Sequence, residues 1–232
     1  MASAKILTPA ELKSTLAKND PAPVYLLAGP DTWRAERTAL WLKEKVLDPQ
    51  SAEFNAQVLQ ADECLPSSIV EAASAYPMFG SKRFVWVRHA EALPSGAALD
   101  GLLQYLDSPV ASTVLVFTSA KLDKRLKFTS ACAKAGCAVD FDTLRGSAIF
   151  TQVARQAANL ALKLSRNGVE ELVDLVGDDL GELQTELEKL ALLQEGEAEI
   201  GPEEVRLLVA RSRDLDAFAV ADLLSSNDPL PA

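Results

Sequence analysis

Val24-Tyr25-Leu26-Leu27-Ala28-Gly29-Pro30-Asp31 is the stretch that decides the fold of this chain. Five consecutive apolar residues end at a Gly-Pro pair, a pattern typical of a short strand that is buried on both faces. Asp31 is a residue type that caps helices, and Trp33, Leu40 and Trp41 recur behind it at helical spacing. The sequence therefore predicts a buried strand followed by a helix.

Four further segments are short and apolar in the same way, and helix-sized segments separate them. The predicted strands are 24–28, 54–59, 83–87, 113–117 and 138–141. The predicted helices are 8–17, 31–47, 66–76, 97–106 and 122–134, the last one basic. Strands that alternate with helices predict an α/β domain: a five-stranded parallel sheet flanked by helices on both faces.

The remainder of the chain predicts helices only, because no strand signal follows Gly146. The predicted helices are 149–160, 165–175, 179–193, one that starts at Gly201-Pro202, and 217–224. We therefore expect two domains, an α/β domain over residues 1–145 and a small helical bundle over 146–232.

The acidic charge is concentrated in the second of these domains. The chain of 232 residues has a net charge of −10, with sixteen basic and sixteen acidic side chains before Gly146 and seven and seventeen from there on. Phosphate binding needs Lys and Arg, so the second domain is not expected to grip nucleic acid, and any DNA contact of this chain is expected to be indirect.

Cysteine usage and hydropathy indicate a reducing, aqueous compartment. Cys64, Cys132 and Cys137 form an odd, scattered set without metal-type spacing, so we expect reduced, largely buried thiols and no metal. No signal-peptide pattern and no run of ~18 apolar residues is found. We expect a soluble, cytoplasmic protein without a membrane partner.

A strand that ends in glycine suggests a nucleotide site, but the chemistry of a phosphate loop is missing after it. Pro30-Asp31-Thr32-Trp33-Arg34-Ala35 holds neither a second glycine nor a lysine, and Pro30 has no N–H to offer. The strand 83–87 runs into Arg88-His89 instead of the acidic pair that would hold a metal ion. We expect no nucleotide cofactor and no ATP hydrolysis, with a divergent nucleotide-binding enzyme as the alternative.

Other catalytic arrangements are equally poor matches. His89 is the single histidine, and no Gly-x-Ser-x-Gly elbow presents a serine to it. The basic cluster between Lys121 and Lys134 is read as a solvated helix face, with contact to a nucleic-acid backbone or an acidic partner left open.

Tyr76-Pro77-Met78-Phe79-Gly80 places two large apolar side chains at a bend just before the strand 83–87. Proline and glycine around Met78 and Phe79 interrupt any regular element. The pair is thus either part of the core or an exposed plug that docks on a partner.

Several segments, in order along the chain, resemble the delta subunit family of the bacterial DNA polymerase III clamp loader. The matching segments are 24–31, 76–85, 121–125, 186–192 and 200–209. The resemblance implies an AAA+ type module, in which a P-loop NTPase-like α/β domain without a functional phosphate loop precedes a helical lid.

The resemblance also implies a function and a site. Members of the family bind the sliding clamp, the beta subunit, through an apolar plug and help to open the ring without hydrolysing ATP. The plug corresponds here to Met78 and Phe79, and Tyr76 and Pro77 are expected to shape the bend. Family members continue into a third, collar-forming domain that this chain does not reach by Ala232, so the resemblance implies weakened association with other loader subunits.

Overall fold

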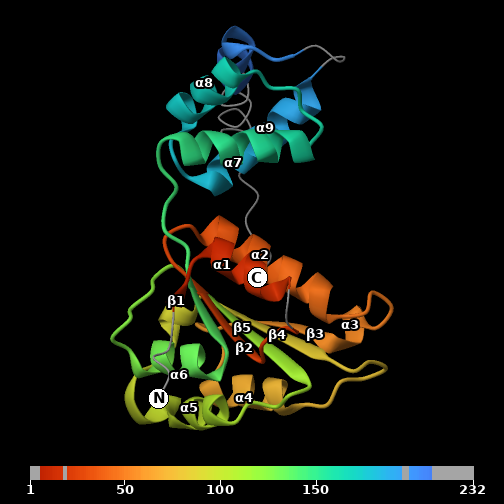
Figure 1. Ribbon diagram of the computed structural model, residues 1–232, viewed down its shortest axis with the longest axis vertical. Coiled ribbons are helices and arrows are strands. Elements are labelled where there is room, and N and C mark those ends of the chain that lie inside the picture. The colour runs from red at the N-terminus through yellow and green to blue at the C-terminus, as the bar shows by residue number, and fades with distance from the viewer. Residues whose placement is uncertain (1–5, 18–19, 195–198, 211–232) are drawn as a thin grey trace, which may run out of the picture. The chain divides into compact units, whose positions relative to one another are not determined.

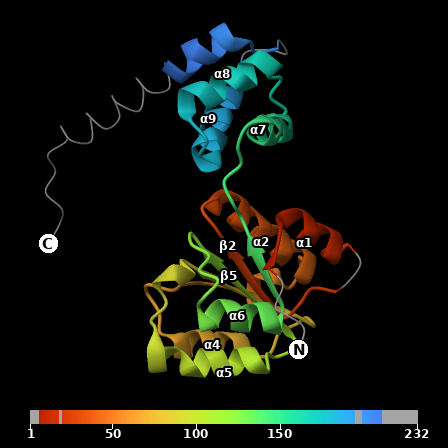
Figure 2. The ribbon, with the colours of Figure 1, turned by 60° about the vertical axis from the view of Figure 1, so that its left-hand side comes forward.

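The computed structural model describes residues 6–17, 20–194 and 199–210, and it divides the chain into two compact units, Met1–Thr143 and Leu144–Ala232. Figures 1 and 2 show the sheet of the first unit and the helices of the second. Each unit is described by itself.

The first unit is built on a six-stranded parallel sheet in the order β1-β6-β2-β5-β4-β3. Its strands are β1 (Ile6–Leu7), β2 (Val24–Ala28), β3 (Ala56–Gln60), β4 (Arg83–Arg88), β5 (Thr113–Ser119) and β6 (Cys137–Asp140). All five residues of β2 are buried, as the uninterrupted apolar run predicts, and Leu26 pairs with Phe117 on one side and Ala138 on the other.

The prediction of five strands was wrong by one. Ile6 and Leu7 form a two-residue edge strand that pairs with Ala138 and Val139 of β6. Two residues are too few to show any periodicity, and the helix signal that starts at Thr8 hides them. The strand predicted at 54–59 starts later, at Ala56, because Ala52–Asn55 form the short helix α3.

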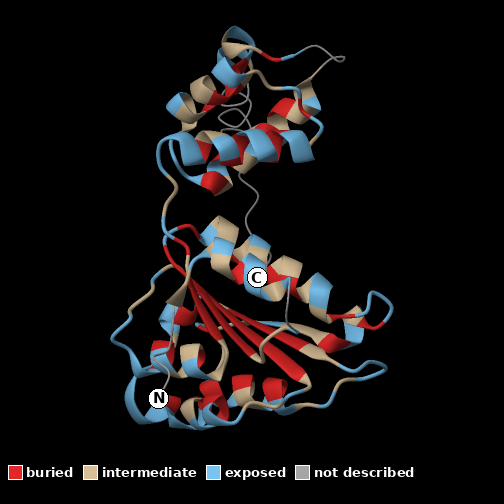
Figure 3. Cartoon of the chain, viewed as in Figure 1, coloured by how far each residue is buried: buried red, intermediate tan, exposed pale blue. Residues whose placement is uncertain are grey.

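Two helical layers cover the sheet, as Figures 1 and 2 show. The helices α1 (Pro9–Leu16) and α2 (Thr32–Val46) pack on one face. The other face is covered by α4 (Pro66–Ser74), α5 (Asp100–Asp107) and α6 (Lys127–Ala135). Alternate residues of β2 supply the two cores, so that Leu26 faces one and Leu27 the other; Figure 3 shows the buried sheet between the layers.

The basic helix predicted at 122–134 starts five residues later, at Lys127. Asp123 forms a turn instead: its carboxylate accepts hydrogen bonds from the amide and the guanidinium of Arg125, and its carbonyl oxygen accepts one from Thr129. The hydrogen bonds from Arg125 lower the pKa of Asp123 to about 2. The helix predicted at 97–106 likewise begins as a 3₁₀ turn, η2 (Gly96–Leu99), before α5.

The second unit is helical. It contains α7 (Ser147–Asn159), α8 (Arg166–Val176), α9 (Leu180–Leu193) and a further helical stretch over 202–210. Asp179 caps α9 by accepting hydrogen bonds from Gly181 and Glu182. An isolated parallel bridge between Leu164 and Ile200 joins two of its loops. The helix predicted at 217–224 lies outside the described residues.

No helix in the described ranges has both the length and the apolar character that spanning a bilayer requires.

The three cysteines are free thiols in different surroundings. Burial raises the pKa of all three thiols, that of Cys137 to about 11, but Cys132 and Cys137 are buried whereas Cys64 is partly exposed. The reagent must reach the thiolate, so native protein at pH 8 is expected to be alkylated at Cys64 first, and at the two buried positions only after unfolding in urea. Mass spectrometry of iodoacetamide-treated protein checks this, and rapid labelling of all three sites in the native state would contradict the packing.

Candidate functional site

The carboxyl ends of β2 and β5 are where a sheet of this topology is expected to bind a ligand. The chain leaves β2 toward α2 on one face and leaves β5 toward α6 on the other, so a crevice is expected between these two strands. What occupies that point decides whether the module handles a nucleotide.

The turn after β2 packs against the end of β6. Gly29 has a φ of +144°, and a Cβ on it would lie 2.4 Å from the carbonyl oxygen of Phe141. The amide of Gly29 donates to the Ser119 carbonyl (3.0 Å), and the amide of Asp31 donates to the Phe141 carbonyl (3.1 Å). These N–H groups are therefore already engaged by backbone oxygens and do not point at a vacant phosphate cradle.

A carboxylate sits at the start of α2, where a phosphate would otherwise bind. Asp31 is buried, and its side chain accepts a hydrogen bond from the Arg34 amide (3.0 Å). The same carboxylate forms an ion pair with Arg34 Nε (2.5 Å). The same guanidinium donates to the carbonyl of Asp142. The positive end of the helix and the nearby cation are thus neutralised internally, and a phosphate would meet the charge of Asp31.

The end of β4 carries no metal-binding acids. Arg88 pairs with Glu36 of α2, and His89 takes a left-handed conformation with a φ of 54°. Partial burial alone would raise the pKa of Glu91, but hydrogen bonds from its own amide and that of Ala120 outweigh this, so its pKa is lowered. Among the residues with a described placement, no group of three or more His, Cys, Asp and Glu could hold a metal ion.

The basic cluster is largely neutralised by acids of this chain. Lys124 pairs with Asp140 (3.1 Å), Arg125 with Asp123 (2.8 Å) and Lys134 with Asp107 (3.2 Å). Each of these three cations has an acidic neighbour that partly cancels its positive charge. This favours the interpretation of the basic cluster as a solvated helix face over a phosphate-binding surface.

The bend before β4 is exposed. Met78 is 53% exposed, Phe79 82% and Tyr76 85%, whereas Pro77 is half-buried between them. The alternative in which Met78 and Phe79 belong to the core was therefore wrong. Large apolar side chains gathered at one exposed point are a feature of surfaces that bind a partner.

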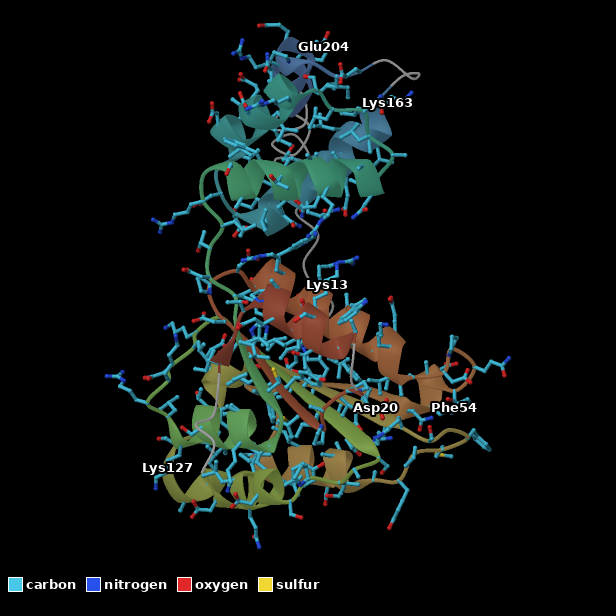
Figure 4. The ribbon with its side chains drawn as sticks, in the orientation of Figure 1. Lys13, Asp20, Phe54, Lys127, Lys163 and Glu204 are labelled. Atoms are coloured by element: carbon cyan, nitrogen blue, oxygen red, sulfur yellow. The ribbon has the colours of Figure 1, made fainter. Side chains whose placement is uncertain are left out.

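Two neighbouring residues, one exposed and one buried, contact this bend, and sequence reasoning missed both. The ring of Phe54, itself 53% exposed, contacts the ring of Phe79 edge to face, with centroids 5.6 Å apart. Figure 4 labels Phe54 at the end of the unit where α3 precedes β3. The side chain of Asn55, fully buried, hydrogen-bonds both the amide and the carbonyl of Met78. Both residues fall inside the strand predicted at 54–59, which gave no reason to place them beside the bend.

The turn after β2 and the bend lie at opposite ends of the sheet. The bend leads into the first residue of β4 and α3 leads into the first residue of β3, whereas Gly29 follows the last residue of β2. Because all these strands are parallel, the apolar surface is at their amino ends and the turn with Gly29 and Asp31 is at their carboxyl ends.

The parallel strand order and the helices on both faces are those of an AAA+ type module, and solved structures agree with this fold. The structure is similar to the Bacillus subtilis DNA clamp loader delta protein YqeN, with a TM-score of 0.60 and 24% identity over 95% of this chain and 72% of that one. It is also similar to the Thermotoga maritima RuvB Holliday junction branch migration motor, with a TM-score of 0.60 and 11% identity over 88% and 69% of the two chains.

The chain belongs to the family of the DNA polymerase III delta subunit, whose model matches residues 25–142. A relative, DNA polymerase III subunit delta of Bacillus subtilis, is 27% identical over 213 residues, which are 88% of this chain. The match spans 61% of the length of that relative. The resemblance noted from the quoted segments is thereby confirmed.

Proposed function

We propose that this chain is a clamp-loader subunit that binds the ring-shaped sliding clamp through Met78 and Phe79 and helps to hold the ring open for loading onto DNA. It does not hydrolyse ATP itself. Other loader subunits are further partners, contact with DNA is made through the assembled loader, and the protein works in the cytoplasm. The observation that carries the proposal is the exposed apolar pair on an ordered bend, in a chain of the delta family.

The chemistry of this pair suits a docking anchor. Phe79 offers a large, stiff ring with most of its surface exposed, and Met78 is an adaptable apolar side chain that fills irregular pockets. Leaving such surface in water is unfavourable by ~25 cal/mol per Å² of apolar area, which a complementary pocket would relieve. The pocket on the clamp is thus expected to be apolar.

Direct binding tests the proposal. Purified chain is titrated against the sliding clamp of the same organism by isothermal titration calorimetry, and saturable binding with a negative heat-capacity change is expected, because apolar surface is buried. Bovine serum albumin in place of the clamp is the control for unspecific apolar contacts. A clamp titration without saturation would reject the proposal.

The alternative, a divergent nucleotide-binding enzyme, predicts a different result. With Gly29 and Asp31 amides engaged and the Asp31 carboxylate at the start of α2, titration with ATP and Mg²⁺ is expected to give no saturable signal at millimolar nucleotide. Fluorescence of a labelled ATP analogue measures this. Stoichiometric binding of the analogue at micromolar concentration would instead favour the nucleotide-binding enzyme. It would also contradict the inference that the turn after β2 has no room for a phosphate.

A further inference from the structure

The side chain of Asn55 is the main support of the bend. Its Oδ1 accepts a hydrogen bond from the amide of Met78 (2.7 Å), and its Nδ2 donates to the carbonyl of Met78 (2.6 Å) and to that of Ser51 (3.1 Å). Asn55 is fully buried although its neighbours Phe54 and Met78 are exposed. One amide group thus fixes the backbone of Met78 from both sides and ties it to α3.

The rest of the bend is built closely around this amide. Phe79 has a φ of 56°, a left-handed conformation that costs free energy for a residue with a Cβ. A Cβ on Gly80 would lie 2.9 Å from the Ser51 hydroxyl and 3.2 Å from Asn55 Nδ2. An added Cβ there would crowd both side chains, so glycine eases the close approach to Asn55, and the Phe79 ring contacts Phe54 at the same time.

These contacts hold the two apolar side chains in one arrangement before any partner is present. Binding to a partner costs free energy for every flexible side chain or loop that must be immobilised, and a preformed bend avoids part of that cost. Two of the three hydrogen bonds of this buried amide go to the backbone of one exposed residue, Met78, and the third goes to Ser51.

We propose that Asn55 is the positioning residue of the apolar plug: it does not touch the partner but sets the geometry in which Met78 and Phe79 enter an apolar pocket. Gly80 assists by allowing the close approach. The inference rests on the proposed function and goes beyond it, because it assigns the affinity of the plug in part to a buried residue on another element.

The direct test is Asn55→Asp, which keeps the shape of the side chain and the acceptor for the Met78 amide. It removes the donor, so that a carboxylate oxygen faces the carbonyls of Met78 and Ser51. Affinity for the sliding clamp is expected to fall about tenfold, the equivalent of the ordering cost of one or two side chains. Asn159→Asp, an exposed position on α7, is the matched control and should bind as the unaltered chain does.

A double-mutant cycle separates positioning from general damage. If Asn55 acts through the plug, Asn55→Asp should change affinity by less than about twofold in a background that already carries Met78→Ala and Phe79→Ala, because interacting sites are not additive. A tenfold loss in both backgrounds would mean that the substitution damages the unit as a whole, and would overturn the inference.

Gly80→Ala tests the same contact from the exposed side and leaves Asn55 itself unsubstituted. Its methyl group would press on Ser51 and Asn55, and a severalfold loss of affinity is expected, whereas Gly101→Ala, where nothing lies within 4 Å, should have no effect. This variant decides the matter if Asn55→Asp does not fold.

The failures are distinguishable. If the double alanine variant loses affinity while folded Asn55→Asp, or failing that Gly80→Ala, binds as tightly as the unaltered chain, the positioning role is overturned and the plug stands. If the unaltered chain does not bind the clamp, both fall.

Discussion

Replacing both Met78 and Phe79 with alanine is expected to weaken binding of this chain to the sliding clamp by at least about thirtyfold, because truncating one anchor at a binding hot spot typically costs ~2 kcal/mol or more. Phe79→Ala alone should account for more of the loss than Met78→Ala, since Phe79 is the more exposed and the less flexible of the two. Calorimetric titration of the clamp with each variant measures the effect.

Folding should be almost unaffected by this change. Both side chains are exposed, so the thermal unfolding midpoint of the double variant is expected to stay within a few degrees of that of the unaltered chain. A matched control replaces Leu192 and Leu207, two exposed apolar residues of the second unit, with alanine. Clamp affinity that is lowered equally by both double variants, or by neither, would remove Met78 and Phe79 from the proposed site.

Gly29→Ala is expected to destabilise the first unit by about 3 kcal/mol or more, since it combines a disfavoured φ with a backbone clash. The new Cβ would lie 2.4 Å from the Phe141 carbonyl oxygen, and the Phe141 backbone cannot retreat without breaking the pairing of β2 with β6. Urea unfolding followed by circular dichroism gives the change in the free energy of unfolding.

Gly101→Ala is the matched control for this prediction. It lies on an exposed position of α5 with no atom within 4 Å of the added Cβ, so a gain of up to ~1 kcal/mol in stability is expected. If Gly29→Ala were as stable as this control, the glycine after β2 would not be needed for packing. That result would favour a role of Gly29 in leaving room for a ligand.

The fold could be predicted from the sequence wherever burial leaves an unbroken apolar run. β2 and β5 are buried along their whole length, and β2 is apolar throughout while β5 is apolar from Val114 to Phe117. The two-residue β1 could not be predicted, because its strand character comes only from pairing with β6. The start of α6 was misplaced because Asp123 and Arg125 satisfy each other in a turn, a local hydrogen bond that helical spacing does not reveal.

The candidate site could be predicted only in part, for a similar reason. Proline and glycine around Met78 and Phe79 mark the bend in the sequence itself. The contribution of Asn55 depends on a contact between residues 23 positions apart, which becomes visible only when α3 and the bend are placed side by side. Phe54 is the same case, since its partner is the ring of Phe79.

The apolar surface and the turn after β2 lie at opposite ends of parallel strands, so substitutions at one end are far from the other. The six residues of β4 alone separate the bend from Arg88 by about 20 Å at ~3.3 Å per residue. Substitutions in the turn after β2 are therefore expected to leave the geometry of the apolar surface unchanged. The two ends of the sheet can in this way change independently of each other.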